Sequence, residues 1–340
     1  MRVISTLGSH CALQVLKGAK DEGFRTLLVT QKAREGLYRR FGFIDEFVVV
    51  ERFRDVLLED NLAVLKRRKA IVVPHGTFIS DLGVDAVEEE LGVPLFGNRK
   101  MLRWEADRGL KEKLIQAAGL STPRTFDAPE DIDRPVIAKQ HGAKGGLGYF
   151  LANDAKSFEA NRRKQEQSGA LAEGAPLYIQ EYVLGVPVYL QFFYSTLRNE
   201  VELLGIDRRY ETTADALGRL PAGMTHDVIP SYMVVGNFPM VLRESLLDEV
   251  YRMGERFVGA AKKLVPPGMI GPFCIEGVYR GDGSFVTFEF SARIVAGTNL
   301  YVQGSPYSAL LGDKPVSMGR RIAIEIKRGI EERRIGELLS

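Results

Sequence analysis

The chain has 340 residues, of which 45% are hydrophobic and 26% are charged, with 35 glycines and 15 prolines. This composition excludes a disordered or collagen-like protein and predicts a globular chain of about two domains. Lysine and arginine number 46 against 44 acidic residues, and this balance gives no electrostatic reason to expect binding to nucleic acid or to a membrane surface.

The first 98 residues alternate short apolar stretches with longer amphipathic ones. We predict strands over residues 2–7, 25–30, 46–50 and 70–74, and helices over residues 12–22, 35–41 and 56–69. Strands and helices that alternate at this spacing predict a parallel sheet with right-handed crossovers. Ligands bind such sheets beyond the carboxyl ends of the strands, where Gly8-Ser9-His10 follows the first strand and His75-Gly76-Thr77 follows the fourth.

The rest of the chain mixes helices with strands. We predict helices over residues 99–122, 157–167, 246–264 and 316–328, and strands over residues 135–139, 148–152, 177–183, 186–194, 200–207, 272–279 and 284–290. Two cysteines, Cys11 and Cys274, are too few for a disulfide framework or a zinc cluster, and their apolar surroundings predict buried free thiols in a reducing cytoplasm. No run of about 20 apolar residues is present, so we expect no membrane-spanning segment.

A glycine-rich loop joins the two predicted strands at 135–139 and 148–152. From Lys139 to Gly148 it contains four glycines, with a second lysine at Lys144. Glycines let backbone N–H groups approach an anion closely, and the lysines add positive charge. The loop matches neither of the phosphate-binding patterns that open a helix, so a flexible flap and a plain turn both remain compatible with it.

Two carboxylates follow apolar stretches of separate late strands. Glu276 lies in Cys274-Ile275-Glu276-Gly277 and Glu289 lies in Phe288-Glu289-Phe290-Ser291. An unpaired buried carboxylate is costly, and a divalent cation would relieve both, with Mg²⁺ suited to hard oxygen ligands and phosphate. Alternatively, each is a surface acid on the exposed face of its strand. Gln180, Glu181, Tyr182 and Val183 lie some forty residues after the loop, where a hinge could hold a purine edge.

In this order, the glycine loop, the hinge and the paired late carboxylates resemble the ATP-grasp enzymes. The resemblance implies an α/β and α+β chain, in which an ATP-grasp fold follows an N-terminal parallel-sheet domain. It implies an N-terminal domain over residues 1–98, a small ATP-grasp subdomain with the glycine flap over 99–190, and a large subdomain with the metal site over 191–340.

Longer segments resemble one archaeal family, the formate-dependent ligases of 5-aminoimidazole-4-carboxamide ribonucleotide in purine biosynthesis. These segments are Leu7-Gly8-Ser9-His10, Pro94-Leu95-Phe96-Gly97-Asn98-Arg99, Leu102-Arg103-Trp104-Glu105, Gly142-Ala143-Lys144-Gly145-Gly146, Asp207-Arg208-Arg209-Tyr210-Glu211, and residues 266–274 and 291–299. The resemblance spans essentially the whole chain. It implies that ATP phosphorylates formate and that the resulting formyl phosphate formylates the amine of the nucleotide.

The resemblance also assigns roles to residues. Lys139 and Lys144 would neutralise phosphate oxygens, Arg293 would take part in catalysis, and Glu276 and Glu289 would hold Mg²⁺, with Mn²⁺ as an alternative. The ATP contacts that it implies besides the two lysines are Gln180, Glu181, Tyr182, Val183 and Glu211.

His10, Thr77 and Asn237 resemble the family's contacts to the aminoimidazole nucleotide. Read without the resemblance, His10 is a helix-cap or core-edge imidazole, Thr77 is a helix N-cap, and Asn237 is a turn residue after Gly236. The resemblance further implies small-molecule substrates, a cytoplasmic location and a homo-oligomer.

The chain departs from the family pattern at a few positions. Leu147 stands where a basic residue is usual, Gln191 where a histidine is common, Thr212-Thr213 where Ser-Asn is common, and Thr77 where a serine is common. Gln191 cannot take up and release a proton as histidine does. Two alternatives therefore stay open: a related carboxylate–amine ligase with another acid or amine, and a non-catalytic nucleotide-binding relative.

Overall fold

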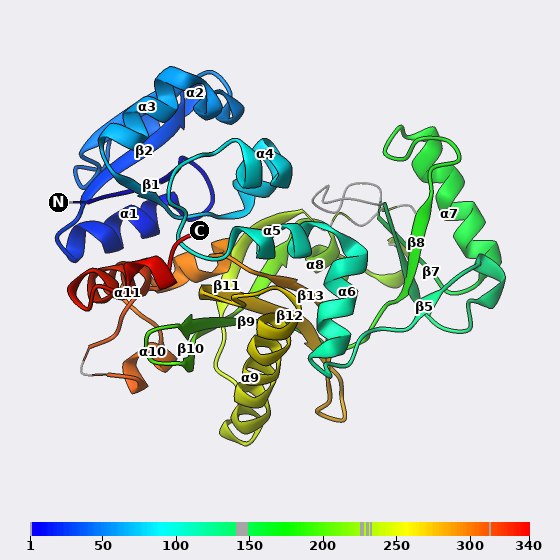
Figure 1. The fold of residues 1–340 in the computed structure, drawn as a ribbon. Coiled ribbons are helices and arrows are strands. Elements are labelled where there is room, and N and C mark those ends of the chain that lie inside the picture. Colours follow the sequence, from blue (N-terminus) through cyan, green and yellow to red (C-terminus); the bar gives the residue numbers. More distant parts are fainter. Residues whose placement is uncertain (1, 141–148, 225–227, 229–230, 232, 313) are drawn as a thin grey trace.

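Three β-sheets organise the chain, as the computed structural model in Figure 1 shows for residues 2–140, 149–224, 228, 231, 233–312 and 314–340. The first sheet has the order β3-β2-β1-β4, with all pairs parallel. Its strands are β1 (Val3–Leu7), β2 (Arg25–Gln31), β3 (Glu46–Val50) and β4 (Ala70–Val72). Apolar side chains are buried along these strands because helices cover the sheet, and the predicted parallel sheet is confirmed.

The helices of this N-terminal part are α1 (Ala12–Asp21), α2 (Lys32–Tyr38), α3 (Glu59–Arg67) and α4 (Val84–Glu89), with short turns η1 (Phe53–Leu57) and η2 (Phe78–Leu82). The single helix predicted over 56–69 is wrong, because Leu58 is extended, with ψ of 143°, and separates η1 from α3. Apolar spacing continues across this break and therefore does not reveal it.

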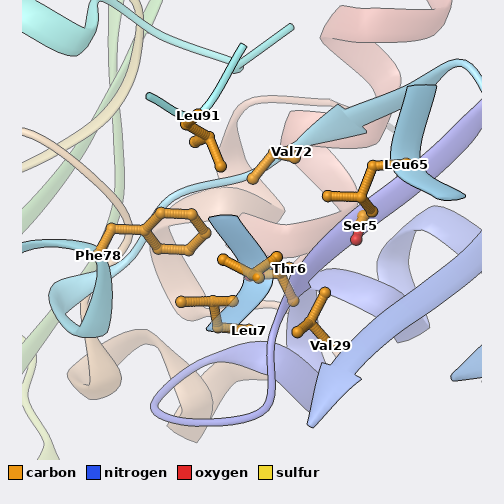
Figure 2. A pocket seen from close by; sticks show the side chains of 9 residues that line it. Ser5, Thr6, Leu7, Val29, Leu65, Val72, Phe78 and Leu91 are labelled. Atoms are coloured by element: carbon orange, nitrogen blue, oxygen red, sulfur yellow. The ribbon is translucent and has the colours of Figure 1, made fainter. Parts of the chain in front are cut away.

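A small cavity lies in the core of the first sheet. Figure 2 shows its lining, which includes Ser5, Val29 and Phe78, and its volume is about 10 Å³. That volume holds about one water molecule. This cavity is therefore too small to bind a substrate.

The second sheet is antiparallel and has the order β11-β10-β9-β12-β13. Its strands are β9 (Val186–Ser195), β10 (Glu200–Glu211), β11 (Val234–Pro239), β12 (Gly271–Tyr279) and β13 (Phe285–Ser291). One face packs on α9 (Leu247–Leu264), where the ring of Phe273 stacks at 5.0 Å from Phe192 and at 5.3 Å from Phe257. The other face carries the polar side chains described below.

The third sheet has the order β5-β8-β6-β7 and lies apart from the N-terminal part, at the right of Figure 1. It consists of β5 (Thr125–Phe126), β6 (Val136–Gln140), β7 (Phe150–Ala152) and β8 (Leu177–Glu181), with α7 (Ala155–Gln167) packed on it. β6 and β7 are antiparallel, which confirms the predicted hairpin. The glycine loop between them, including Lys144 and Leu147, lies outside the described residues.

Helices α5 (Arg99–Ala106) and α6 (Arg108–Ala117) connect the first and third sheets. The single helix predicted over 99–122 is wrong, because Asp107 leaves the helical conformation, with ψ of 123°, and caps a new helix. Its carboxylate accepts a hydrogen bond of 2.9 Å from the backbone N–H of Leu110. Gly119, with φ of +63°, then follows the end of α6.

Removing this cap is expected to lower the stability of the chain. Asp107→Ala should reduce the free energy of unfolding by about 1 kcal/mol, because one N–H at the start of α6 loses its acceptor. Urea denaturation measures the change. Asp107→Asn keeps an acceptor oxygen and should stay close to the wild type, so equal losses in the two variants would contradict the capping role.

Helix α11 (Met318–Glu331) returns to the N-terminal part and packs on α1 (Figure 1). The two backbones approach so closely that a Cβ at Gly18 would lie 2.2 Å from the backbone nitrogen of Arg320, and one at Gly319 would lie 2.3 Å from the carbonyl oxygen of Gln14. Glycine is therefore required at both positions. The chain then pairs Leu339 with Phe96 beyond the edge of the first sheet.

The remaining short elements are α8 (Ala214–Leu217), α10 (Pro306–Leu310), η3 (Pro129–Asp131), η4 (Ala222–Met224), η5 (Glu244–Leu246), η6 (Ala296–Tyr301) and η7 (Ile335–Glu337). Among the described residues, no helix combines the length and the apolar character needed to cross a membrane. Cys11 and Cys274 are buried free thiols, as predicted. The three-part division at residues 98 and 190 stays a prediction, and β9 crosses its second boundary.

Candidate active site

The polar face of the second sheet places the two candidate metal ligands side by side. In the strand register, Asp207 lies opposite Tyr189, Tyr189 opposite Glu276, and Glu276 opposite Glu289. Side chains directly opposite each other in antiparallel strands lie on the same face with neighbouring Cβ atoms. The two carboxylates, which are 13 residues apart in the sequence, therefore face the same volume.

Each of these carboxylates is paired with a cation. Arg209 lies 2.9 Å from Glu276, whose other oxygen accepts a 3.0 Å hydrogen bond from Ser291, and the Lys111 ammonium contacts Glu289. Burial raises the pKa of Glu276, although Arg209 opposes this effect. Burial would also raise the pKa of Glu289, but Lys111 more than reverses this and lowers it to about 2. Glu289 is therefore ionised throughout the neutral range.

The donor set fits a magnesium ion. Two carboxylates supply hard oxygen ligands, and Mg²⁺ is commonly held in proteins by one or two carboxylates together with substrate phosphates. Within the described ranges, no group of three or more His, Cys, Asp or Glu side chains could surround a metal. Glu276 and Glu289 are thus the two residues that would hold the ion, and substrate phosphates would neutralise part of its charge.

Lys139 reaches the same region from the hairpin of the third sheet. Its ammonium donates a 2.9 Å hydrogen bond to Oε1 of Gln180 and lies 5.9 Å from the centre of the Phe288 ring. Burial lowers its pKa to about 8. Glu289 opposes this effect on the Lys139 pKa, so the structure brings Lys139, Gln180 and the carboxylate pair together.

The other predicted ATP contacts follow β8. Glu181 accepts hydrogen bonds from Arg280 at 2.8 Å and from the backbone N–H of Arg124 at 3.2 Å, so its carboxylate ties β8 to neighbouring segments. Tyr182 and Val183 continue from it, and Tyr182 donates its backbone N–H to the carbonyl of Pro135. Burial raises the pKa of Tyr182, and Glu211 adds to this effect from the end of β10.

The residues predicted to contact the aminoimidazole nucleotide start at the carboxyl ends of β1 and β4. Nδ1 of His10 and Oγ1 of Thr77 lie 3.0 Å apart. A Cβ on Gly76 would lie 2.9 Å from Nε2 of His10, so a larger residue at position 76 would displace the imidazole. The His10 ring also stacks on His75, with ring centres 5.3 Å apart.

Arg293 lies beside this pair of strand ends. It forms a 2.8 Å ion pair with Glu105 of α5, and its guanidinium would lie 3.4 Å from the same Cβ on Gly76. Burial lowers the pKa of His10, and Arg293 adds to this effect. His10, Thr77 and Arg293 therefore converge, although they are up to 283 residues apart in the sequence.

The structure decides against the helix-cap roles considered for His10 and Thr77 and against the turn role considered for Asn237. Thr77 makes no side-chain cap to the helical turn that follows it, and its hydroxyl instead faces His10. Cys11, not His10, precedes the first residue of α1. Asn237 lies within β11, opposite Arg209, and not in a turn.

Sequence reasoning assigned no role to Arg209, Lys111, Glu105 or Asp207. Arg209 lies beyond residue 207, where the predicted strand ended, whereas β10 continues to Glu211. The alternation of side chains along a longer strand would have placed Asp207, Arg209 and Glu211 on one face. For Lys111 and Glu105, no sequence signal points to partners that lie more than 170 residues away.

A hollow of about 570 Å³ lies away from this site, between the β9–β10 hairpin and α9, with Tyr194, Glu200, Tyr251 and Lys262 in its lining. None of its lining residues belongs to the polar face that carries the carboxylates.

Known proteins are similar to this chain in sequence and in fold. A family model described as a domain of unknown function (DUF1297) matches residues 157–340, and one described as a protein of unknown function (DUF1246) matches residues 4–126. The 5-formaminoimidazole-4-carboxamide-1-(beta)-D-ribofuranosyl 5'-monophosphate synthetase of Cenarchaeum symbiosum is 56% identical over 342 residues, which cover 100% of each chain.

Two solved structures are similar in fold. The crystal structure of an IMP biosynthesis protein PurP from Thermococcus kodakaraensis has a TM-score of 0.80 and 32% identity, covering 99% of this chain and 100% of its own. N5-carboxyaminoimidazole synthetase from Staphylococcus aureus, complexed with ADP, has a TM-score of 0.62 at 13% identity, covering 88% of this chain and 73% of its own, and shows the fold alone. The chain therefore belongs to the family of 5-formaminoimidazole-4-carboxamide-1-(beta)-D-ribofuranosyl 5'-monophosphate synthetases and has an ATP-grasp fold preceded by a parallel-sheet domain.

Proposed function

We propose that the chain uses ATP and formate to formylate the 5-amino group of 5-aminoimidazole-4-carboxamide ribonucleotide. One observation carries this proposal beyond family membership. Lys139 lies close enough to Glu289 to lower the pKa of that carboxylate, and Arg293, which lies beside His10 at Gly76, acts in the same way on Glu276. A phosphoryl donor and a small acid–amine pair would thus meet over one face of the sheet.

The first chemical step would be transfer of the γ-phosphoryl group to formate. An oxygen of formate forms a bond to the γ-phosphorus as the bond from that phosphorus to the bridging oxygen of ADP breaks. Such transfers depend on positioning and charge neutralisation more than on a protein nucleophile. The Lys139 ammonium would neutralise phosphate oxygens, and Arg293 would orient the acid. Mg²⁺ held by Glu276 and Glu289 would supply further charge neutralisation at the phosphates.

The second step would transfer the formyl group to the nucleotide. The amine nitrogen attacks the formyl carbon, the carbon–oxygen bond to phosphate breaks, and inorganic phosphate leaves while the nitrogen loses a proton. His10 and Thr77 would hold the nucleotide at the carboxyl ends of β1 and β4, the edge where parallel sheets bind ligands. Asn237 would contact it from β11.

ADP release tests the proposal and separates it from the two alternatives. The assay combines ATP and Mg²⁺ with formate or another small acid, and with the carboxamide ribonucleotide or another amine. Release that requires both formate and this nucleotide supports the proposal. Release only with another acid or amine indicates a related ligase, and no release with any pair indicates a nucleotide-binding protein without turnover.

The rate is expected to fall as the pH rises above about 8. Burial lowers the pKa of Lys139 to about 8, with Arg108 and Lys111 adding to this effect and Glu289 opposing it. Only the ammonium form neutralises phosphate, so kcat/KM for ATP should fall about tenfold per pH unit above that value. A pH–rate profile measures this decline.

Lys139→Arg is the control for this profile, because a guanidinium stays charged over the same range and should remove the decline. An identical decline in both proteins would contradict the assignment to Lys139.

The stability of the chain should rise with pH over the range in which the rate falls. The unfolded chain keeps the proton up to the ordinary pKa of 10.5, so the free energy of unfolding should rise between about pH 8 and that value.

We also propose that the chain acts in the cytoplasm as a homo-oligomer. The two buried free cysteines support a reducing compartment.

A further inference from the structure

Asp207 is a buried carboxylate that the proposed reaction does not use. It lies in β10, its side chain is fully buried, and within the described ranges it forms no ion pair with Lys or Arg. Its two oxygens accept hydrogen bonds from side-chain amides instead, at 2.5 Å from Nε2 of Gln191 and at 2.7 Å from Nδ2 of Asn237. A buried charge held only by neutral donors needs an explanation, because an apolar residue would avoid its desolvation cost.

Asp207 also lies against the segment that supports His10. A Cβ on Gly297 of η6 would lie 2.3 Å from Oδ2 of Asp207, so the backbone of η6 packs directly on this carboxylate. Two residues later, the side chain of Asn299 donates a 3.0 Å hydrogen bond to the backbone carbonyl of His10. Asp207 therefore contacts both Asn237 and the segment that holds His10. Asn237 and His10 are two of the residues proposed to contact the aminoimidazole nucleotide.

The chemistry of a carboxylate fixes the orientation of both amides. An ionised carboxylate only accepts hydrogen bonds, so the NH₂ groups of Gln191 and Asn237 must face it. Gln191 is itself buried. Asn237 is partly exposed, and its Oδ1 points away from Asp207. Among the described residues, none donates a hydrogen bond to this oxygen.

We propose that Asp207 is a positioning residue, which orients the Asn237 amide so that its carbonyl oxygen accepts a hydrogen bond from an N–H group of the aminoimidazole nucleotide. This inference rests on the proposed function and names the chemistry by which the site recognises its amine substrate. The nucleotide offers two such donors, its 5-amino group and its carboxamide. ATP is not involved in this contact.

Asp207→Asn tests the inference. An asparagine at position 207 has one acceptor oxygen and one NH₂ group, so it can accept from only one of the two amides. Gln191 is buried and Asn237 is partly exposed, so the oxygen stays with Gln191, and the Asn237 amide turns its own oxygen toward position 207 and presents an NH₂ group to the ligand. The KM for the carboxamide ribonucleotide should rise at least about tenfold, while the KM for ATP stays within about twofold. Asp127→Asn, at an exposed position, is the matched control and should change neither constant.

The double variant Asp207→Asn/Asn237→Asp keeps the hydrogen bond between the two positions and again presents an acceptor oxygen to the ligand. It should recover most of the lost affinity, and it tests the inference even if Asp207→Asn alone does not fold.

The same KM measurement with 5-aminoimidazole ribonucleotide, which lacks the carboxamide, identifies which N–H group of the nucleotide is the donor. If the carboxamide supplies it, Asp207→Asn should leave the KM for this analogue unchanged, and if the amino group does, that KM should rise as well.

An unchanged KM for the ribonucleotide in Asp207→Asn, equal changes for both substrates, or no recovery in the double variant would each overturn the positioning role alone. Absence of formate-dependent turnover by the wild-type chain with this nucleotide would overturn the proposed function and this inference together.

Discussion

Replacing Glu289 by glutamine is expected to lower kcat about 1000-fold, the effect of losing a preorganised electrostatic contact to the transferring group. Glutamine keeps the shape of the side chain but removes one of the two negative charges that face each other across β12 and β13. Lys111 then loses its anionic partner, and a divalent cation loses half of its anionic protein ligands. Initial rates of ADP release measure the loss.

A second measurement separates this role from a structural one. ADP binding to the wild-type chain should tighten when Mg²⁺ is added, whereas binding to Glu289→Gln should respond much less. Glu173→Gln, at an exposed position, is the matched control and should behave as the wild type. Wild-type rates in Glu289→Gln, or an unaltered response of ADP binding to Mg²⁺, would contradict the metal role.

Arg293→Met should have the largest effect on stability. The ion pair between Arg293 and Glu105 is buried, with 15% and 6% of the two side chains exposed. Removing the guanidinium leaves the carboxylate of Glu105 buried without its cation, which should lower the free energy of unfolding by about 3 kcal/mol. Urea denaturation measures this change. Arg252→Met removes an exposed ion pair with Asp248 and should cost less than about 1 kcal/mol.

Replacing both partners distinguishes stability from catalysis. In Arg293→Met/Glu105→Met, no unpaired charge remains buried, so most of the lost stability should return. Activity should stay at least about 100-fold below the wild type, because the acid substrate still lacks its cation. Recovery of activity together with stability would show that Arg293 acts only through the fold.

The sequence predicted the elements whose patterns are local. The N-terminal parallel sheet could be predicted because its buried strands are continuous apolar stretches, and the hairpin on either side of the glycine loop could be predicted from its flanking strands. The helix over 99–122 was wrong because apolar spacing continues from α5 into α6, while the side chain of Asp107 ends one helix and caps the next. Spacing alone does not distinguish an interior aspartate from a cap.

The site could be predicted only in part, since its partners meet through tertiary structure. Glu276 and Glu289 stood out as charges in apolar strands, but their cations could not be identified. Arg209 lies 67 residues from Glu276, and Lys111 lies 178 residues from Glu289. The strand order β11-β10-β9-β12-β13 brings Arg209 to its partner, and the packing of α6 on the sheet brings Lys111 to Glu289. Neither arrangement leaves a periodic pattern in the sequence.

The packing of α11 on α1 has a consequence for synthesis of the chain. The ribosome makes α1 about 300 residues before α11, so the face of α1 around Gly18 stays uncovered while the nascent chain grows. Contacts of such long sequence separation also slow folding. We therefore expect nascent chains released before residue 318 to expose apolar surface and to associate with chaperones, although the strands of their first sheet are complete.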